Sequence, residues 1–180
     1  YYSLYFYDIL GYTKEKASLI ITNLSYLRPI SAIIAGYLAD MVYSRRCTIV
    51  LFIFLLVSYL CLGFFDYANN LIFIIYLNFI ISLISIFSLR GIFYSLLKET
   101  NIPYSITGIS VGIISLIGYF PDVIIGPVFG YLLGNSNNLS DYQNCFIFLF
   151  MISLFGLISS LVLPKKVLRW LIIMIIEMRT

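Results

Sequence analysis

Long apolar stretches separated by short polar ones make up most of the chain. A membrane-spanning helix needs about 20 mostly apolar residues. Five stretches meet this length, at about 17–41, 47–65, 70–97, 105–133 and 145–163. The shorter apolar segment 1–10 is interpreted as the end of an earlier span. The pattern predicts an all-α integral membrane protein with about five complete transmembrane helices, the end of a sixth, and no separate soluble domain.

Basic residues occur in alternate loops, which gives the spans an orientation. Lys and Arg follow the first, third and fifth spans, at Arg45, Arg46, Lys98 and 165–169. The loops 66–69 and 134–144 contain neither residue. Because positive loops remain on the cytoplasmic side, we expect a cytoplasmic C-terminus. The membrane domain would cover 1–163, and the tail 164–180 would lie in the cytoplasm or along the interface.

Composition supports the membrane class and excludes several functions. The chain is 62% hydrophobic and 11% charged, against about 45–50% apolar and about 25% charged in soluble proteins. Histidine is absent, and the three cysteines have no metal or redox spacing. No basic stripe suits nucleic acid, and no phosphate-binding Gly-x-x-x-x-Gly-Lys loop is present. We expect no enzyme activity, no cofactor, no metal and no nucleic-acid partner.

One arginine lies deep within the first span. Arg28 is about eleven residues from the outer end, roughly 16 Å deep in a core of about 30 Å. A charge at that depth costs about 3 kcal/mol or more and usually has a role. Arg28 could bind an anionic substrate or act in gating, since its guanidinium suits carboxylate or phosphate. It could also pair structurally with Asp122 or with a missing part of the protein, or extend to the interface.

The fourth span carries a carboxylate beside a proline, Pro121-Asp122. Asp122 could carry a coupling proton or contact substrate. It could equally pair with a cation, or cap a half-helix that restarts after a break at Pro121. We expect Arg90, near the cytoplasmic end of the third span, to extend to the lipid headgroups. Further candidates for lining a solute path are Tyr119, Tyr94 and Asn78.

Two spans resemble each other in sequence although they run in opposite directions. The first contains Gly36-Tyr37-Leu38 after Pro29, and the fourth contains Gly130-Tyr131-Leu132 after Pro121 and Pro127. Such interrupted helices at matching positions are typical of inverted repeats in transporters. Glycines at four-residue spacing should permit close or sliding helix contacts, or only static packing. These helix-contact glycines are Gly108, Gly112, Gly126 and Gly130.

The segment from Gly36 to Asp40, followed by Arg45 and Arg46, resembles the loop signature of the major facilitator superfamily (MFS). Met41 and Tyr43 stand where that signature has a basic residue and a glycine. The stretch 90–103, with Thr107-Gly108 and 118–122, resembles the tenth and eleventh helices of bacterial inner-membrane permeases of that superfamily. The resemblance covers residues 1 to about 163 and implies the C-terminal half, from the end of helix 7 through helix 12.

The resemblance implies a fold and a function. The fold would be the six-helix half of an MFS protein with a 3+3 inverted repeat. The function would be secondary transport of a small polar solute by alternating access, with an organic anion or sugar derivative favoured by Arg28. Gly36, Asp40, Arg45 and Arg46 would form a cytoplasmic gate, unless they serve only as an orientation signal. The expected partners are the bilayer, the solute, a coupling proton or sodium, and a missing N-terminal six-helix half.

Two other functions remain open. The chain begins Tyr-Tyr-Ser without methionine, so we expect a fragment, and a truncated membrane partner that does not transport is an alternative. The other is an integral-membrane enzyme acting on lipid, which the scattered Asp, Glu and Cys residues do not favour.

Overall fold

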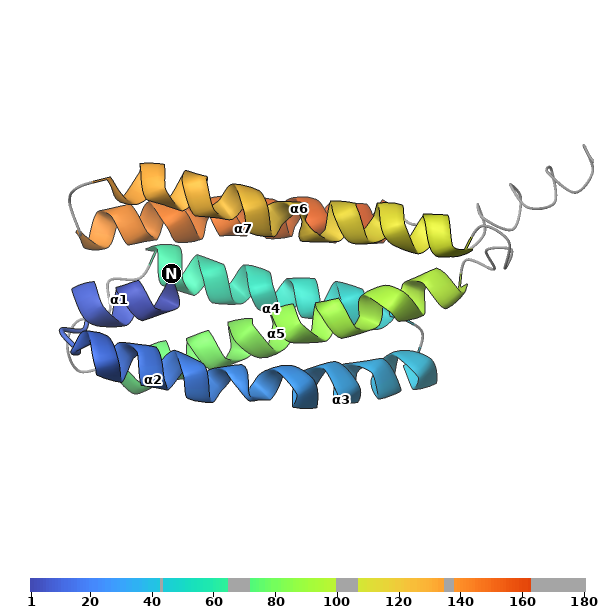
Figure 1. Ribbon diagram of the computed structural model, residues 1–180, viewed down its shortest axis with the longest axis horizontal. Helices are drawn as coiled ribbons and strands as arrows, with labels where there is room; N and C mark the ends of the chain where they lie inside the picture. The colour runs from blue at the N-terminus through green and yellow to red at the C-terminus, as the bar shows by residue number, and fades with distance from the viewer. Residues whose placement is uncertain (43, 65–71, 100–106, 135–137, 163–180) are drawn as a thin grey trace, which may run out of the picture.

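The protein is a bundle of helices in the computed structural model, which describes residues 1–42, 44–64, 72–99, 107–134 and 138–162. Within these ranges every regular element is α-helical. The bounds are α1 Tyr2–Asp8, α2 Lys14–Ser25, α3 Leu27–Val42, α4 Ser44–Phe64, α5 Ile72–Glu99, α6 Thr107–Leu133 and α7 Leu139–Val162. The elements lie side by side in an elongated bundle (Figure 1).

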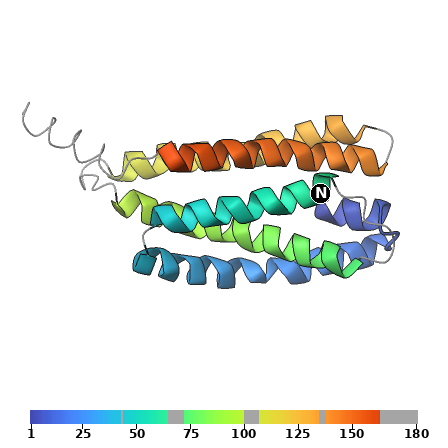
Figure 2. The same cartoon turned by 180° about the vertical axis from the view of Figure 1, so that it is seen from behind.

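Five stretches are long and apolar enough to cross a membrane: Lys14–Val42, Ser44–Phe64, Ile72–Ile92, Val111–Leu133 and Leu139–Val162. The predicted all-α class and the five spans are therefore confirmed, by length and composition. Successive spans run in opposite directions, while α2 and α3 follow each other within one span (Figures 1 and 2). We call the end with α1 the α1 end, and the end where α3 passes into α4 the α4 end.

The first span is two helices, not one. Helix α2 ends at Ser25 and α3 begins at Leu27, with Tyr26 in a turn between them. Pro29 accounts for this break, because proline has no N–H to donate to the Ser25 carbonyl and its ring crowds that carbonyl. The start of α2 is fixed by Thr13, whose side chain accepts a hydrogen bond from the backbone N–H of Lys16 at 3.4 Å.

Helix α6 has no break at Pro121, in contrast to the interrupted helix that the sequence suggested. It runs unbroken from Thr107 to Leu133 with Pro121 and Pro127 inside it. Asp122 therefore caps no restarting half-helix, and that alternative is wrong. Each proline removes one hydrogen bond, but a long apolar helix can continue through such a position when its remaining backbone bonds are kept. Helix α6 ends before Gly134, whose φ of +51° is in the left-handed region that glycine adopts readily.

The core lies toward the α1 end and is rich in aromatic side chains. Phe6 and Phe79 are fully buried, with ring centroids 5.2 Å apart. Tyr5 packs edge-on against Tyr142, with centroids 5.4 Å apart. Tyr2 also shares a hydrogen bond of 3.1 Å with Ser82. These contacts join the short helix α1 to α5 and α7, so α1 is an integral part of the bundle.

One span without charged residues in its apolar stretch, α4, has other helices on two sides. It packs between α5 and α7. Glycines permit this, because a Cβ on Gly63 would lie 3.1 Å from Ile147 and one on Gly156 would overlap the ring of Phe52. Uniform hydrophobicity does not separate lipid contact from helix contact, since both surroundings are apolar.

Candidate functional site: charged residues halfway along the bundle

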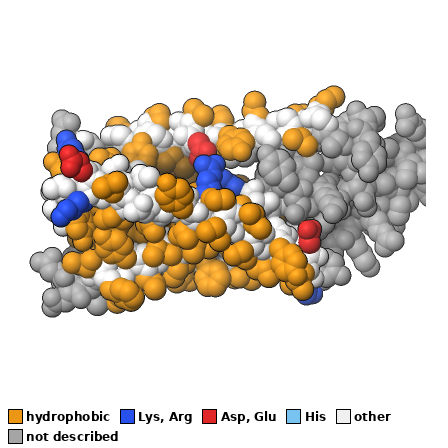
Figure 3. All heavy atoms as spheres, turned by 60° about the horizontal axis from the view of Figure 1, so that its bottom comes forward, with side chains coloured by type: hydrophobic (Ala, Val, Ile, Leu, Met, Phe, Trp, Pro, Cys, Tyr) orange, Lys and Arg blue, Asp and Glu red, His pale blue; other side chains and the backbone are white. Residues whose placement is uncertain are grey.

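Three charged residues from three helices lie near the middle of the bundle. Arg28 is about 14 residues from each end of the Lys14–Val42 span, or about 21 Å. Arg90 is about nine residues before the end of α5, and Asp122 is about eleven residues before the end of α6. Figure 3 shows basic and acidic side chains together midway along a face that is otherwise largely hydrophobic. We call Arg28, Arg90 and Asp122 the central charge cluster.

Arg90 and Asp122 form an ion pair between α5 and α6. One terminal guanidinium nitrogen of Arg90 donates to both carboxylate oxygens of Asp122, at 2.8 Å and 2.7 Å. The two side chains are 38% and 50% exposed, respectively. An ion pair at this depth cannot face hydrocarbon without a large cost, so its open side requires water or further protein.

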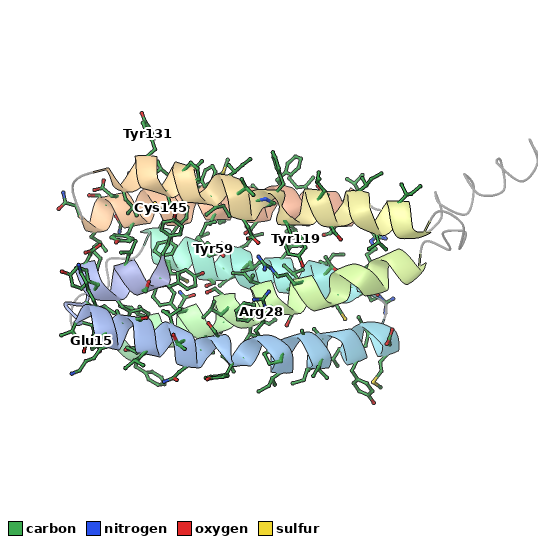
Figure 4. All side chains as sticks on the ribbon, viewed as in Figure 1. Glu15, Arg28, Tyr59, Tyr119, Tyr131 and Cys145 are labelled. Carbon is green, nitrogen blue, oxygen red and sulfur yellow. The ribbon has the colours of Figure 1, made fainter. Side chains whose placement is uncertain are left out.

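Aromatic rings support both arginines. The guanidinium of Arg28 lies over the ring of Phe87, 5.8 Å from its centroid. The guanidinium of Arg90 lies at the same distance over the ring of Tyr119. Phe87 and Arg90 are three residues apart on α5, so they lie on one helix face. Arg28 and Tyr119 extend into the same middle part of the bundle (Figure 4), which makes the cluster continuous from α3 through α5 to α6.

The cluster carries an excess of positive charge. Two arginines face one aspartate, and within the described residues Arg28 has no carboxylate within ion-pair distance. Cation–π contact stabilises a guanidinium but does not neutralise it. The arrangement can therefore accept an anion, and planar guanidinium groups suit carboxylate or phosphate oxygens.

The geometry sorts the alternatives left open by the sequence. Asp122 pairs with Arg90, so the proposed structural pair of Arg28 with Asp122 is absent here. The guanidinium of Arg90 is held by Asp122 in the middle of α6, a pairing that the expected extension to the headgroups did not include. Sequence reasoning missed this residue. Helix α5 continues to Glu99, so Arg90 lies about 13 Å before the end of the helix. The length of the helical segment after Arg90 was the feature of the sequence that could have indicated this position.

The other candidates for lining a path are divided. Tyr119 lies beside the central charge cluster, because its ring contacts Arg90. Asn78 does not, because it is buried between α4 and α5, where the Ser58 hydroxyl donates to its backbone carbonyl at 3.2 Å and also to its side-chain oxygen. The side chain of Tyr94 and the tail 164–180 lie outside the described residues.

The predicted gate residues lie at the α4 end, where Arg45 contacts the end of α7. Its Nε and a terminal nitrogen donate to the carbonyls of Ser160 and Leu161, at 3.2 Å and 2.7 Å. These carbonyls belong to the last turn of α7, where a cation compensates the partial negative charge of the helix end. Asp40 and Arg46 are exposed at the same end, and Gly36 is partly buried.

The expected helix-contact glycines make no close helix contact in the described part of the chain. A Cβ on Gly108, Gly112 or Gly130 would meet nothing within 4 Å, and one on Gly126 would meet only the Tyr1 hydroxyl, at 3.6 Å. The close approach occurs instead at Gly91, where a Cβ would lie 2.8 Å from the Ala32 carbonyl oxygen. Gly91 therefore permits the crossing of α3 and α5.

Two of the hollows in the described part of the chain are relevant to a solute path. One, of about 620 Å³, lies at the α1 end and is lined by residues of α1, α2, α6 and α7, including Asp8, Lys14, Gly130 and Tyr142. The other, of about 450 Å³, is lined almost wholly by apolar side chains of α3, α4 and α5. Only the first has the mixed polar lining that a polar solute requires.

Among the described residues, no group of three or more Cys, Asp or Glu side chains could hold a metal ion. The central charge cluster is thus built from guanidinium, carboxylate and aromatic groups alone. Comparison with known proteins adds no assignment, since no family model, no curated protein and no solved structure matches this chain.

Proposed function

We propose that the chain is the C-terminal half of a secondary transporter that moves a small anionic solute by alternating access. The observation that carries this proposal is the central charge cluster: two arginines and one aspartate midway along a bundle of five apolar spans. Charges at membrane depth are rare, and they mark substrate or ion pathways. The excess positive charge favours an organic anion over a neutral sugar.

A route to the cluster is available along one face of α6. Asp122, Gly126 and Gly130 follow one another at four-residue intervals, so they share that face. Gly130 lines the hollow at the α1 end. A Cβ added at Gly126 or Gly130 would meet little or nothing, so there is room beside the helix at these positions. This spacing supports a solute path from the α1 end to Arg90 and Arg28.

The proposal extends to the surroundings of the bundle. The exposed side of the cluster would be covered by an N-terminal half, as in an MFS permease with two 3+3 inverted repeats. The α4 end, with Arg45 and Arg46, would be cytoplasmic by the positive-inside rule. The protein would then lie in a bacterial inner membrane and use a proton or sodium gradient.

Uptake measurements on Arg28 variants of the full-length protein test the proposal. Cells expressing it would be given a panel of radiolabelled organic anions, including succinate, lactate and a sugar phosphate. We expect Arg28→Ala to reduce uptake of the transported anion at least tenfold, because a cation that faces it is lost. Arg28→Lys should retain part of the activity, since it keeps the charge.

Membrane abundance and thermal stability of each variant serve as controls for folding. Glu15→Gln, at the exposed start of α2, provides a matched change of charge away from the cluster and should transport normally. Undiminished uptake by a folded Arg28→Ala protein would remove Arg28 from the site. Absence of uptake of every anion by the wild-type protein would contradict the proposed function itself.

A further inference from the structure

We infer that Asp122 is a resident anion that occupies Arg90 until a solute displaces it. The inference rests on the proposed function and specifies how the central charge cluster binds its substrate. In the unloaded state Asp122 neutralises Arg90. When a solute arrives, its carboxylate or phosphoryl oxygens take the place of the Asp122 oxygens on the same guanidinium.

The geometry of the ion pair resembles that of a bound ligand. Both oxygens of Asp122 accept from a single nitrogen of Arg90, at 2.8 Å and 2.7 Å. A solute carboxylate carries the same two oxygens at the same separation, so it can make the same bonds. The remaining donors of the Arg90 guanidinium stay available for a second interaction. The site is therefore already shaped for the group that it would receive.

Exposure allows the exchange. Arg90 is 38% exposed and Asp122 is 50% exposed, so neither partner is sealed within the bundle. A fully buried pair would resist exchange, because separating its members leaves an uncompensated charge in a region of low dielectric constant. Here the displaced carboxylate can turn toward the open side.

Arg28 gives the solute an advantage that Asp122 lacks. It lies over Phe87, one helical turn from Arg90 along α5, and has no carboxylate within ion-pair distance among the described residues. Asp122, fixed to α6, bonds Arg90 alone. A free anion is not tethered to α6, so it can interact with Arg28 as well as with Arg90 and thereby compete with Asp122.

The exchange would also free α6. This helix packs mainly against α7 and makes few direct contacts with α5. In the described part of the chain, the Arg90–Asp122 pair, with Tyr119 over Arg90, joins α6 to α5 at mid-length. Release of Asp122 removes the ion pair from that link at the moment when solute binds. Binding energy is thereby connected to helix movement, as alternating access requires.

Binding measurements on the purified full-length protein in lipid nanodiscs test the inference, with succinate and inorganic phosphate as probes. Asp122→Asn removes the competing anion, so we expect it to bind the better probe at least tenfold more tightly than the wild type does. Arg90→Gln should abolish binding. The double variant Arg90→Gln/Asp122→Asn should also fail to bind, which shows that the gain depends on Arg90.

A second measurement uses the wild-type protein and so does not depend on the folding of any variant. A carbodiimide modifies accessible carboxyl groups, and its reaction at Asp122 can be followed by peptide mass spectrometry. We expect the probe to increase modification of Asp122, because the displaced carboxylate leaves Arg90. A site in which Asp122 contacts the solute directly would show protection instead.

The outcomes separate this inference from the proposed function. If the wild type binds a probe but Asp122→Asn binds it no more tightly, or if the probe protects Asp122, Asp122 is not displaced and the inference fails while an anion site remains. If neither the wild type nor Asp122→Asn binds any probe, both the anion site and the inference are wrong.

Discussion

At the scale of single residues, chemically similar side chains have very different roles. Arg90 bonds a carboxylate between helices, Arg28 lies on an aromatic ring, and Arg45 donates to the carbonyls that end α7. Arginine serves all three because its planar group offers five donors and a flat face. Only the contacts, and not the residue type, separate a substrate-binding candidate from a structural one.

Asn78 illustrates a polar residue whose role is structural. Because its oxygens accept from the buried Ser58 hydroxyl, we expect Asn78→Ala to lower the free energy of unfolding by about 1 kcal/mol, a typical value for a hydrogen bond between membrane helices. Thermal unfolding in detergent measures this loss. Asn23→Ala, on the exposed side of α2, is the matched control and should change little.

Transport kinetics distinguish this role from a position on the solute path. For Asn78→Ala we expect an unchanged KM in the uptake assay. A raised KM without any loss of thermal stability would return Asn78 to the path.

At the scale of helices, the small residues determine how closely the elements approach. The crossing of α3 and α5 leaves no room for a side chain at Gly91, since a Cβ there would lie 2.8 Å from a backbone oxygen that cannot rotate away. The glycines of α6 are the opposite case, because three of them face open space. Glycine spacing alone does not separate these cases, since both occur in apolar helices.

Paired alanine substitutions test the difference. We expect Gly91→Ala to destabilise the protein by about 1–3 kcal/mol, as overpacking usually does. Gly112→Ala meets nothing within 4 Å and should be neutral or stabilising by up to about 1 kcal/mol, since alanine favours helix. Unfolding in detergent compares the two, and equal stability would mean that α3 and α5 are not in close contact at Gly91.

A bulky substitution on α6 tests whether its glycine face is a route for solute. We expect Gly130→Phe to reduce uptake at least tenfold without loss of stability, because the ring would enter the hollow at the α1 end. Gly108→Phe adds the same ring on α6 outside that hollow and should leave uptake unchanged. Normal uptake by Gly130→Phe would place the route elsewhere.

At the scale of the whole molecule, the alternation of helix directions makes a prediction about the two faces of the membrane. Glu15 and Asp40 lie near opposite ends of the Lys14–Val42 span, and both are exposed. In a variant without the native cysteines, we expect Glu15→Cys to react with a membrane-impermeant maleimide added outside intact cells. Asp40→Cys should react only after the membrane is opened. Reaction of both from one side would contradict a spanning helix.

The number of spans was predictable because it depends on the length of apolar runs, which the sequence displays directly. The division of the first span was also predictable, since Pro29 has no N–H to donate and so interrupts helical hydrogen bonding. The pairing of Asp122 with Arg90, and not with Arg28, was not predictable. It depends on how α5 and α6 are rotated and displaced relative to each other, and the charges carry no information about that.

Packing of α4 between α5 and α7 has a consequence for how the protein is made. The ribosome delivers α3, α4 and α5 in succession, so these neighbours can associate as soon as they enter the bilayer. The partner of Arg45 at Ser160 comes 115 residues later, and until then one side of α4 has only lipid to contact. A polypeptide stopped before α7 would present that unfinished surface to membrane proteases. Insertion of α7 therefore covers the remaining side of α4.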